Sequence, residues 1–243
     1  MDRYEKDPAR PARFVTFRKD RAFVKEVGEA LIHVKALRRL ESLNLDDIGI
    51  TDKDLAQLKD LKALQQLYLT HTKITDAGLA HIKGLTQLRV LNLSYTQVTD
   101  AGLEHLKNLK ELHSLTLPRT KVTDAGLAQI KGLTKLQRLN LGGTQITDEG
   151  LRHLTGLGNL KSLTLAGNSL TDKGLVHVGK ITSLESLQLH GTKVTDKGLA
   201  HLKGLIGLRS LVIPEAAAKP AAVAELKRVL PLLRDVRGEP PPS

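Results

Sequence analysis

A line of histidines recurs along the chain at a spacing that raises the question of metal binding. The line shares one repeat position and comprises His81, His105, His153, His177 and His201. Zinc needs its ligand atoms within about 2.0–2.1 Å of one centre, whereas equivalent residues of successive repeats point in parallel and stand too far apart. We therefore interpret these histidines as partly exposed surface residues and predict no metal site and no cofactor. The alternative is a surface whose charge rises as the pH falls through about 6.5.

A second line consists of aspartates, each preceded by a threonine. Its members are Asp76, Asp100, Asp124, Asp148, Asp172 and Asp196. The repeat lacks the short Gly/Asp turns typical of calcium-binding solenoids, so a calcium ladder is disfavoured. An Asp or Thr oxygen at the start of a helix accepts hydrogen bonds from its free N–H groups. The line predicts capped short helices.

Catalytic chemistry finds no support in the sequence. The chain has no cysteine, which excludes disulfides, thiolate zinc sites and a thiol nucleophile. It also lacks GxSxG, HExxH and a phosphate-binding glycine loop. We therefore predict that the protein is not an enzyme.

The charge balance is basic, with 37 Lys and Arg against 26 Asp and Glu. The excess is densest in the first 39 residues, and the repeats offer only Tyr68 and Tyr95 as platforms for stacking bases. Nucleic-acid binding is thus not expected, and binding of an anionic surface by the N-terminal segment is a weaker alternative. No stretch approaches the roughly 20 apolar residues of a membrane span, and the amino terminus does not resemble a signal peptide, which favours a cytoplasmic location.

A repeat of 24 residues positions all these side chains. Apolar residues of the stretch 61–84, such as Leu67 and Leu69, return as Leu91 and Leu93 and continue nearly to the end. A unit this short cannot bury its apolar face alone, so fixed self-similarity at this period predicts a solenoid. The alternation around Leu67 and Leu69 predicts a strand whose Tyr68 faces outward, followed by a short helix on the opposite side.

The repeats divide the chain into predicted regions. We expect a flexible basic tail at 1–12, an N-terminal cap at 13–36, repeats at 37–213 (seven full and a partial eighth), a C-terminal cap at 214–236 and a disordered tail at 237–243. In the caps we expect a strand at 13–17, a helix within 18–37 that includes Phe23 and Val24, a helix from Pro220 to about Leu230, and a strand near 232–236.

The pattern resembles the leucine-rich repeat family, whose consensus LxxLxLxxNxL is matched by Leu160, Leu163, Leu165, Asn168 and Leu170. Other repeats carry threonine at the Asn position: Thr72, Thr96, Thr120, Thr144 and Thr192. A hydroxyl there can serve the turn backbone with fewer hydrogen bonds. The TDxGLxxLxxL form is similar to 24-residue repeats abundant in some bacteria, planctomycete-like in character. The resemblance implies a curved right-handed α/β solenoid, with a parallel sheet on the concave face, short helices on the convex face, and protein ligands on the concave face.

Two sets of glycines have separate predicted roles. The first set follows each aspartate and is expected to allow close packing between coils: Gly78, Gly102, Gly126, Gly150, Gly174 and Gly198. The second set, joined by Asn108, is predicted to supply left-handed residues that end the helices: Gly84, Gly132, Gly156 and Gly204.

The best functional lead is a column beside the strands that changes along the chain. Asp47, His71, Tyr95 and Arg119 give way to three glycines, Gly143, Gly167 and Gly191. Tyr and Arg are favoured interface anchors. We therefore predict a partner-binding patch on the N-terminal half of the concave face, consisting of Tyr68, His71, Asn92, Tyr95, His113 and Arg119. The alternative is that these are tolerated substitutions on an idle surface.

The sequence thus predicts a non-catalytic protein–protein interaction scaffold, expected to be monomeric. Two alternatives stay open. The chain could be a structural or regulatory segment of a larger multidomain protein, or the substrate-recruiting part of an effector or ubiquitin-ligase-like system.

Overall fold

The computed structural model describes residues 13–17 and 27–238. The predicted tail at 1–12 lies outside these residues, as do Phe23 and Val24 of the predicted cap helix and the last residues, 239–243.

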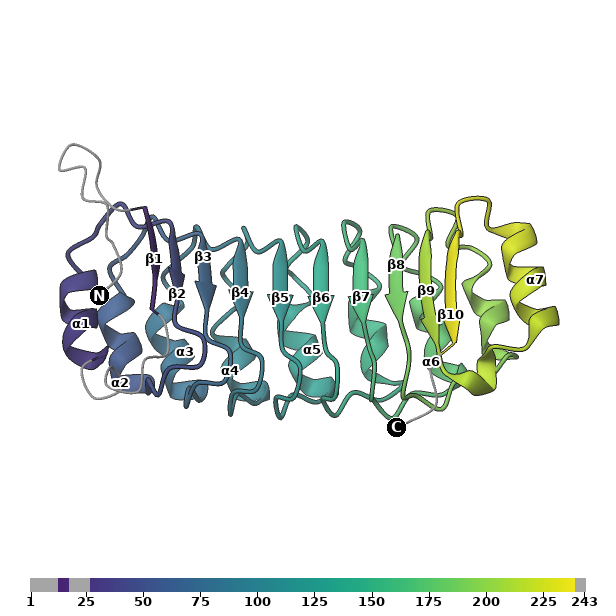
Figure 1. The fold of residues 1–243 in the computed structure, drawn as a ribbon, viewed down its shortest axis with the longest axis horizontal. Helices are drawn as coiled ribbons and strands as arrows, with labels where there is room; N and C mark the ends of the chain where they lie inside the picture. The colour runs from purple at the N-terminus through teal and green to yellow at the C-terminus, as the bar shows by residue number, and fades with distance from the viewer. Residues whose placement is uncertain (1–12, 18–26, 239–243) are drawn as a thin grey trace.

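The fold is built on one parallel sheet with its strands in sequence order (Figure 1). The strands are β1 (Phe14–Thr16), β2 (Ser42–Asn44), β3 (Gln66–Tyr68), β4 (Val90–Asn92), β5 (Ser114–Thr116), β6 (Arg138–Asn140), β7 (Ser162–Thr164), β8 (Ser186–Gln188), β9 (Ser210–Ile213) and β10 (Asp235–Gly238). Neighbouring repeats pair one period apart, so that Leu67 lies opposite Leu91. The parallel sheet confirms the α/β solenoid class.

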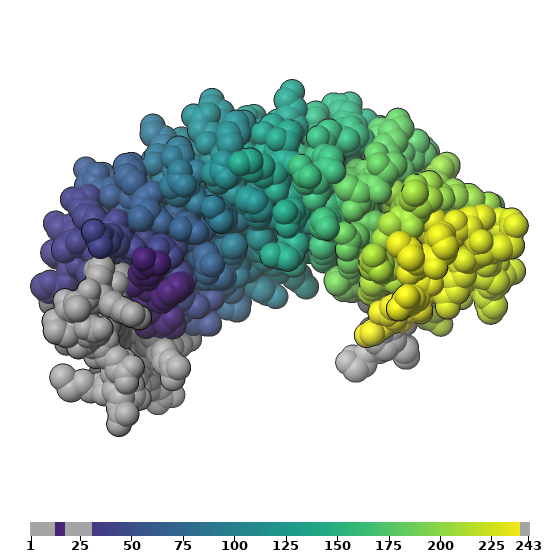
Figure 2. Space-filling model, turned by 90° about the horizontal axis from the view of Figure 1, so that it is seen from above, coloured from purple at the N-terminus to yellow at the C-terminus, as the bar shows by residue number. Residues whose placement is uncertain are grey.

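Short helices cover the other side of the sheet (Figure 1). They are α1 (Val27–Val34), α2 (Asp52–Leu55), η2 (Ala56–Leu58), α3 (Asp76–Ile82), α4 (Asp100–Glu104), α5 (Asp124–Ile130), η3 (Gly150–Leu154), α6 (Asp172–Val178), η4 (Gly198–Leu202), η5 (Glu215–Ala217) and α7 (Pro220–Val229). Figure 2 shows the stack bent into an arc, and comparison with Figure 1 places the strands on its hollow side. No helix among the described residues is long and apolar enough to cross a membrane.

The core lies between these two layers and is mostly leucine, with isoleucine and valine in most of the remaining positions. Leu67 and Leu69 are fully buried, as are their equivalents in the following repeats. Each three-residue strand, β1 to β8, buries its central residue and leaves the flanking residues partly or fully exposed, as in β3. The predicted alternation is confirmed, and it leaves one row of outward side chains on each side of the buried leucines.

The turn after each of the strands β3 to β8 is stabilised from inside by the threonine or asparagine of the repeat. Thr72 Oγ1 donates a hydrogen bond to the Leu69 carbonyl at 2.7 Å. Asn168 donates to the carbonyls of Leu141 (2.7 Å) and Leu165 (3.1 Å) and accepts from the Ile146 N–H (3.0 Å). The asparagine therefore joins two repeats, whereas Thr72 bonds only within its own, as expected from the smaller hydrogen-bonding capacity of a hydroxyl. Thr144 is the exception, because its hydroxyl also lies 3.0 Å from Asn168 Oδ1 of the next repeat.

The aspartate line has a different role from the predicted one. Thr99, not Asp100, caps α4, because its side chain accepts from the Ala101 N–H at 3.3 Å. Asp76 of the preceding repeat accepts from the Thr99 N–H at 2.8 Å and from its hydroxyl at 2.6 Å. Capping of the short helices is therefore confirmed for the threonines of α3 to α6 and wrong for the aspartates, which from Asp52 to Asp172 tie each repeat to the next.

The first glycine set makes room for these ties. A Cβ atom added to Gly102 would lie 2.4 Å from Asp76 Oδ1, and Gly126 stands in the same relation to Asp100. Real Cβ atoms essentially never come this close, so only glycine leaves the carboxylate in place. The predicted close packing between coils is confirmed, and its partner is a side chain of the preceding repeat.

The second glycine set does not adopt the predicted conformation. None of Gly84, Gly132, Gly156 and Gly204, nor Asn108, has a positive φ. Lys83 at the end of α3 stays right-handed, and the chain then closes a tight turn in which the Leu85 N–H donates to the Ile82 carbonyl at 2.9 Å. The prediction of left-handed helix ends is wrong, because this turn needs no left-handed residue.

The two ends of the sheet are closed by atypical units. At the N-terminal end β1 pairs with β2, and at the C-terminal end α7 and β10 cover β9. The prediction that disorder begins at residue 237 is wrong for Arg237 and Gly238, because both pair with β9. Backbone pairing does not require apolar side chains, which explains why their composition gave no signal of a strand.

Candidate functional site

The left-handed residues among those that the structure describes all lie in one column, at the turn that follows each of the strands β2 to β8. Among the described residues, seven have positive φ, and they are the column noticed in the sequence: Asp47 (60°), His71 (53°), Tyr95 (55°), Arg119 (57°), Gly143 (61°), Gly167 (66°) and Gly191 (68°). We call the four non-glycine members, Asp47, His71, Tyr95 and Arg119, the turn ladder. A left-handed non-glycine residue costs roughly 1–3 kcal/mol and persists where surrounding structure imposes it.

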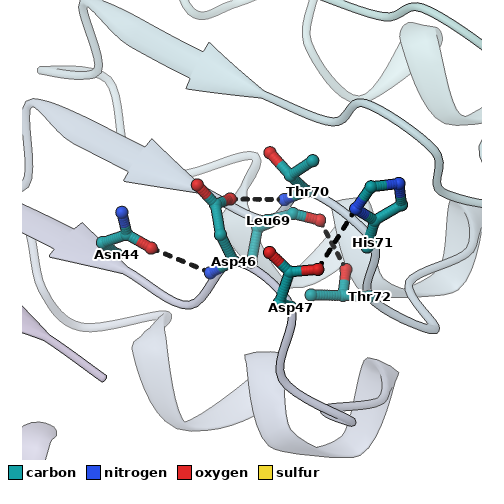
Figure 3. A network of polar contacts seen from close by, with 7 residues as sticks. All are labelled: Asn44, Asp46, Asp47, Leu69, Thr70, His71 and Thr72. Carbon is teal, nitrogen blue, oxygen red and sulfur yellow. Dashed lines mark hydrogen bonds and ion pairs between the residues drawn. The ribbon is translucent and has the colours of Figure 1, made fainter. Parts of the chain in front are cut away.

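Hydrogen bonds around the turn impose this conformation (Figure 3). Asn44 Oδ1 accepts from the Asp46 N–H at 2.8 Å, and Asp46 Oδ1 accepts from the Thr70 N–H of the next repeat at 2.6 Å. The Asp47 N–H donates to the Thr70 carbonyl at 2.8 Å. The backbone is thus fixed by neighbouring groups, and the ladder side chain is left free to project outward.

Three ladder side chains contact one another in series. Asp47 Oδ1 lies 3.2 Å from His71 Nδ1 (Figure 3), and the rings of His71 and Tyr95 have centroids 4.3 Å apart with a 40° tilt. Tyr95 is 50% exposed, the largest exposure of any tyrosine in the repeats. The result is an acid, an imidazole and a phenol in contact along one edge of the sheet.

Arg119, the fourth member, extends toward the next repeat. A Cβ atom added to Gly143 would lie 2.9 Å from Arg119 Nε, so the arginine stem crosses the space that any other residue at 143 would fill. The first glycine of the column therefore has a second use beyond its left-handed backbone. It accommodates the last side chain of the ladder.

The other predicted site residues are placed differently. Tyr68 is the last residue of β3 and Asn92 the last residue of β4. The Asn92 side-chain oxygen accepts from the Ser94 N–H at 3.0 Å, just as the Asn44 oxygen accepts from the Asp46 N–H. Tyr68 donates to Gln66 Oε1 at 3.3 Å. Asn92 thus shapes its own turn.

His113 is not brought together with the ladder. It immediately precedes β5, with Nδ1 2.6 Å from the Glu111 carbonyl oxygen, whereas Arg119 follows the opposite, carboxyl end of the same strand. Conversely, Asp47 was not among the predicted site residues, although it contacts His71. Its place in the same sequence column was the signal that could have included it.

The histidine line lies on the convex side and does not converge. His81 and His201 are exposed, the other three are half-buried, and no group of three potential metal ligands occurs within 13–17 and 27–238. Burial, together with the charges of Arg152 and Lys131, lowers the pKa of His153. That histidine therefore gains charge only at a lower pH than an ordinary one.

Comparisons with known proteins agree with this geometry. The family profile described as Leucine rich repeat matches residues 38–98 and 110–170. Among solved structures, internalin C2 of Listeria monocytogenes is 29% identical, with a TM-score of 0.61, over 72% of this chain and 71% of that one. An internalin, InlF, of the same bacterium is 26% identical, with a TM-score of 0.44, over 74% of this chain and 63% of that one. No curated protein gives a significant match. The profile covers half of the sequence, and the chain therefore belongs to the leucine-rich repeat family.

Proposed function

We propose that the protein is a non-catalytic protein-binding scaffold and that the turn ladder is the centre of its contact surface. Leucine-rich repeat domains commonly serve as interaction scaffolds. The observation that supports this assignment is the run of four left-handed non-glycine residues followed by three glycines at the same position. Glycine meets the backbone requirement without strain, so the four side chains have a use other than folding.

The chemistry of the ladder suits a protein partner. Tyrosine and arginine dominate binding energy in many interfaces because each buries a large surface and also offers directed hydrogen bonds. Tyr95 and Arg119 are exposed on adjacent repeats, and His71 supports the Tyr95 ring from one side. Tyr68 lies on the strand face of the same repeat as His71 and widens the surface.

The proposal also includes four more specific features of the protein. They are the bacterial 24-residue repeat type, the cap boundaries near 13–36 and 214–236, a monomeric state and a cytoplasmic location. No observation favours a structural segment of a larger protein, or a substrate-recruiting part of an effector, over the scaffold.

The test is affinity capture from lysate of the source organism, followed by titration of the captured protein after its purification. The baits are the intact chain, Tyr95→Ala/Arg119→Ala, and the matched control Lys83→Ala/Lys131→Ala at the exposed ends of α3 and α5. We expect the ladder variant to weaken binding at least about tenfold, because hot-spot truncations cost about 2 kcal/mol or more, and the control to bind normally. Equal affinity of all three chains, or capture of nothing by the intact chain, would refute the proposal.

A further inference from the structure

Two arginines on the concave face have no acidic partner. Arg119 and Arg138 are both exposed, and neither guanidinium has an ion pair or side-chain hydrogen bond within the part of the chain that the structure describes. Several arginines elsewhere are paired with carboxylates, such as Arg209 with Glu185 at 3.8 Å and Arg228 with Glu225 at 3.1 Å. The two concave arginines are therefore available to a ligand.

The surface around them is free of carboxylates. The outward positions from β4 to β7 hold Val90, Asn92, Tyr95, Ser114, Thr116, Pro118, Arg119, Arg138, Asn140, Gly142, Gly143, Ser162, Thr164 and Gly167, with Ser94 and Ala166 buried between them. Glu111, at the amino edge beside β5, is engaged by Lys135 at 2.6 Å. Glu185, at the same edge beside β8, is engaged by Lys161 at 2.8 Å. A cleft wall lined by one sign of charge raises the local concentration of ligands of the opposite sign.

The separation of the two arginines indicates the size of the ligand. Arg138 opens β6 opposite Ser114, and Arg119 lies five residues beyond Ser114. At about 3.3 Å per residue for an extended strand, the two backbones stand at most about 16 Å apart along the strand direction. The Arg119 stem lies over Gly143, five residues beyond Arg138 on the same chain. Carboxylates several residues apart on an extended segment can reach the two guanidinium groups in these positions, whereas one small anion would have to draw both side chains together. The floor between them consists of short side chains, Ser114, Thr116 and Gly142.

We infer that the partner presents an acidic, extended protein segment across β5 and β6, with carboxylates on Arg119 and Arg138. Tyr95 borders the segment at the turn ladder and supplies an aromatic contact. This inference rests on the proposed scaffold function and names the chemistry of its partner. A nucleic acid fits less well, because Tyr95 is the one aromatic side chain near the arginines among the described outward positions, and the ladder ends in the carboxylate of Asp47.

The experiment measures fluorescence anisotropy of a labelled oligo-glutamate peptide on the full chain. An oligo-glutamine peptide of equal length and an oligothymidylate of equal charge serve as comparison probes. The test variant is Arg119→Gln/Arg138→Gln, and the control is Lys83→Gln/Lys131→Gln, which removes the same charge from the convex side. We expect oligo-glutamate to bind more tightly than either comparison probe. The test variant should weaken its binding at least about tenfold and the control less than about threefold, since charge-assisted contacts are local whereas net attraction is not.

A second pair of variants separates the side-chain position from the charge. Gly143→Ala places a Cβ atom against Arg119 Nε, whereas Gly167→Ala carries the same left-handed strain but meets only Gly143 backbone at 3.6 Å. We expect Gly143→Ala, and not Gly167→Ala, to weaken oligo-glutamate binding.

Three results would overturn the inference. They are equal losses in the concave and convex double variants, no preference for glutamate over glutamine, and tighter binding of oligothymidylate. If oligo-glutamate fails while the captured partner still requires Tyr95 and Arg119, the scaffold function stands and only the acidic partner falls.

Discussion

Two lines of residues run the length of the stack, and they differ in what varies. On the helix side, the Asp–Thr–Gly line has the same residues and the same bonds in repeat after repeat. On the concave side, the column after the strands keeps one backbone conformation while its residues change from Asp, His, Tyr and Arg to glycine. The constant line holds repeats together. The variable column is where the chain departs from what the fold needs, and that departure indicates function.

The largest loss of stability is expected from removing an aspartate of the constant Asp–Thr–Gly line. In Asp100→Ala the Thr123 N–H and hydroxyl lose their acceptors, now at 2.7 and 2.6 Å. Hydrogen bonds to a charged group contribute about 1.5–3 kcal/mol, so we expect a loss of about 2–4 kcal/mol in the free energy of unfolding, measured with urea. Glu104→Ala, which removes only an exposed pair with Lys107, should cost less than about 0.5 kcal/mol. Equal effects of the two changes would contradict the assigned role.

The two glycine sets should respond in opposite directions. Gly126→Ala brings a Cβ atom 2.4 Å from Asp100 Oδ1 and should destabilise the chain by about 1–3 kcal/mol through overpacking. Gly156→Ala meets nothing within 4 Å and has no positive φ. It should be neutral or stabilising by up to about 1 kcal/mol, because alanine restricts the unfolded chain. Calorimetric melting compares the two variants. A destabilised Gly156→Ala would contradict this account, because it would indicate that Gly156 ends its helix in a left-handed conformation.

A smaller effect on stability is expected from the exposed ion pairs of Glu225, which lies in the C-terminal helix α7 and has no equivalent in the repeats. Arg228 and Lys203 lower the pKa of Glu225 on α7 from 4.5 to about 2. A lowered pKa stabilises the fold above the unfolded value, and that stabilisation is lost as the pH falls from about 4.5 toward about 2. The melting temperature of the intact chain should exceed that of Glu225→Gln at neutral pH, and the difference should vanish near pH 2 and shrink in salt. A difference unchanged at pH 2 would exclude these ion pairs as its source.

The sequence predicted the repeat, the buried leucines and the sheet order because each depends on periodicity alone. It failed where a bond crosses from one repeat to the next. Nothing in the sequence around Asp76 shows that its acceptor oxygens serve Thr99 of the following repeat instead of its own helix.

The candidate site was recognised as a column of changing residues, but its significance depends on backbone geometry. Only the structure shows that Tyr95 and Arg119 share the left-handed conformation of Gly143. It also separates His113, which lies at the other end of its strand from Arg119. A sequence column gives the repeat position, whereas the edge of the sheet and the sign of φ come from folding.

The central claim is that the four ladder side chains serve a partner and not the fold. It is tested most directly by the free energy of unfolding of a variant with Asp47, His71, Tyr95 and Arg119 all replaced by glycine. Relief of left-handed strain opposes the greater freedom of glycine in the unfolded chain. We therefore expect a stability within about 1 kcal/mol of the intact chain, or above it. A loss of more than about 3 kcal/mol would show that the ladder is part of the folding machinery and would contradict the account.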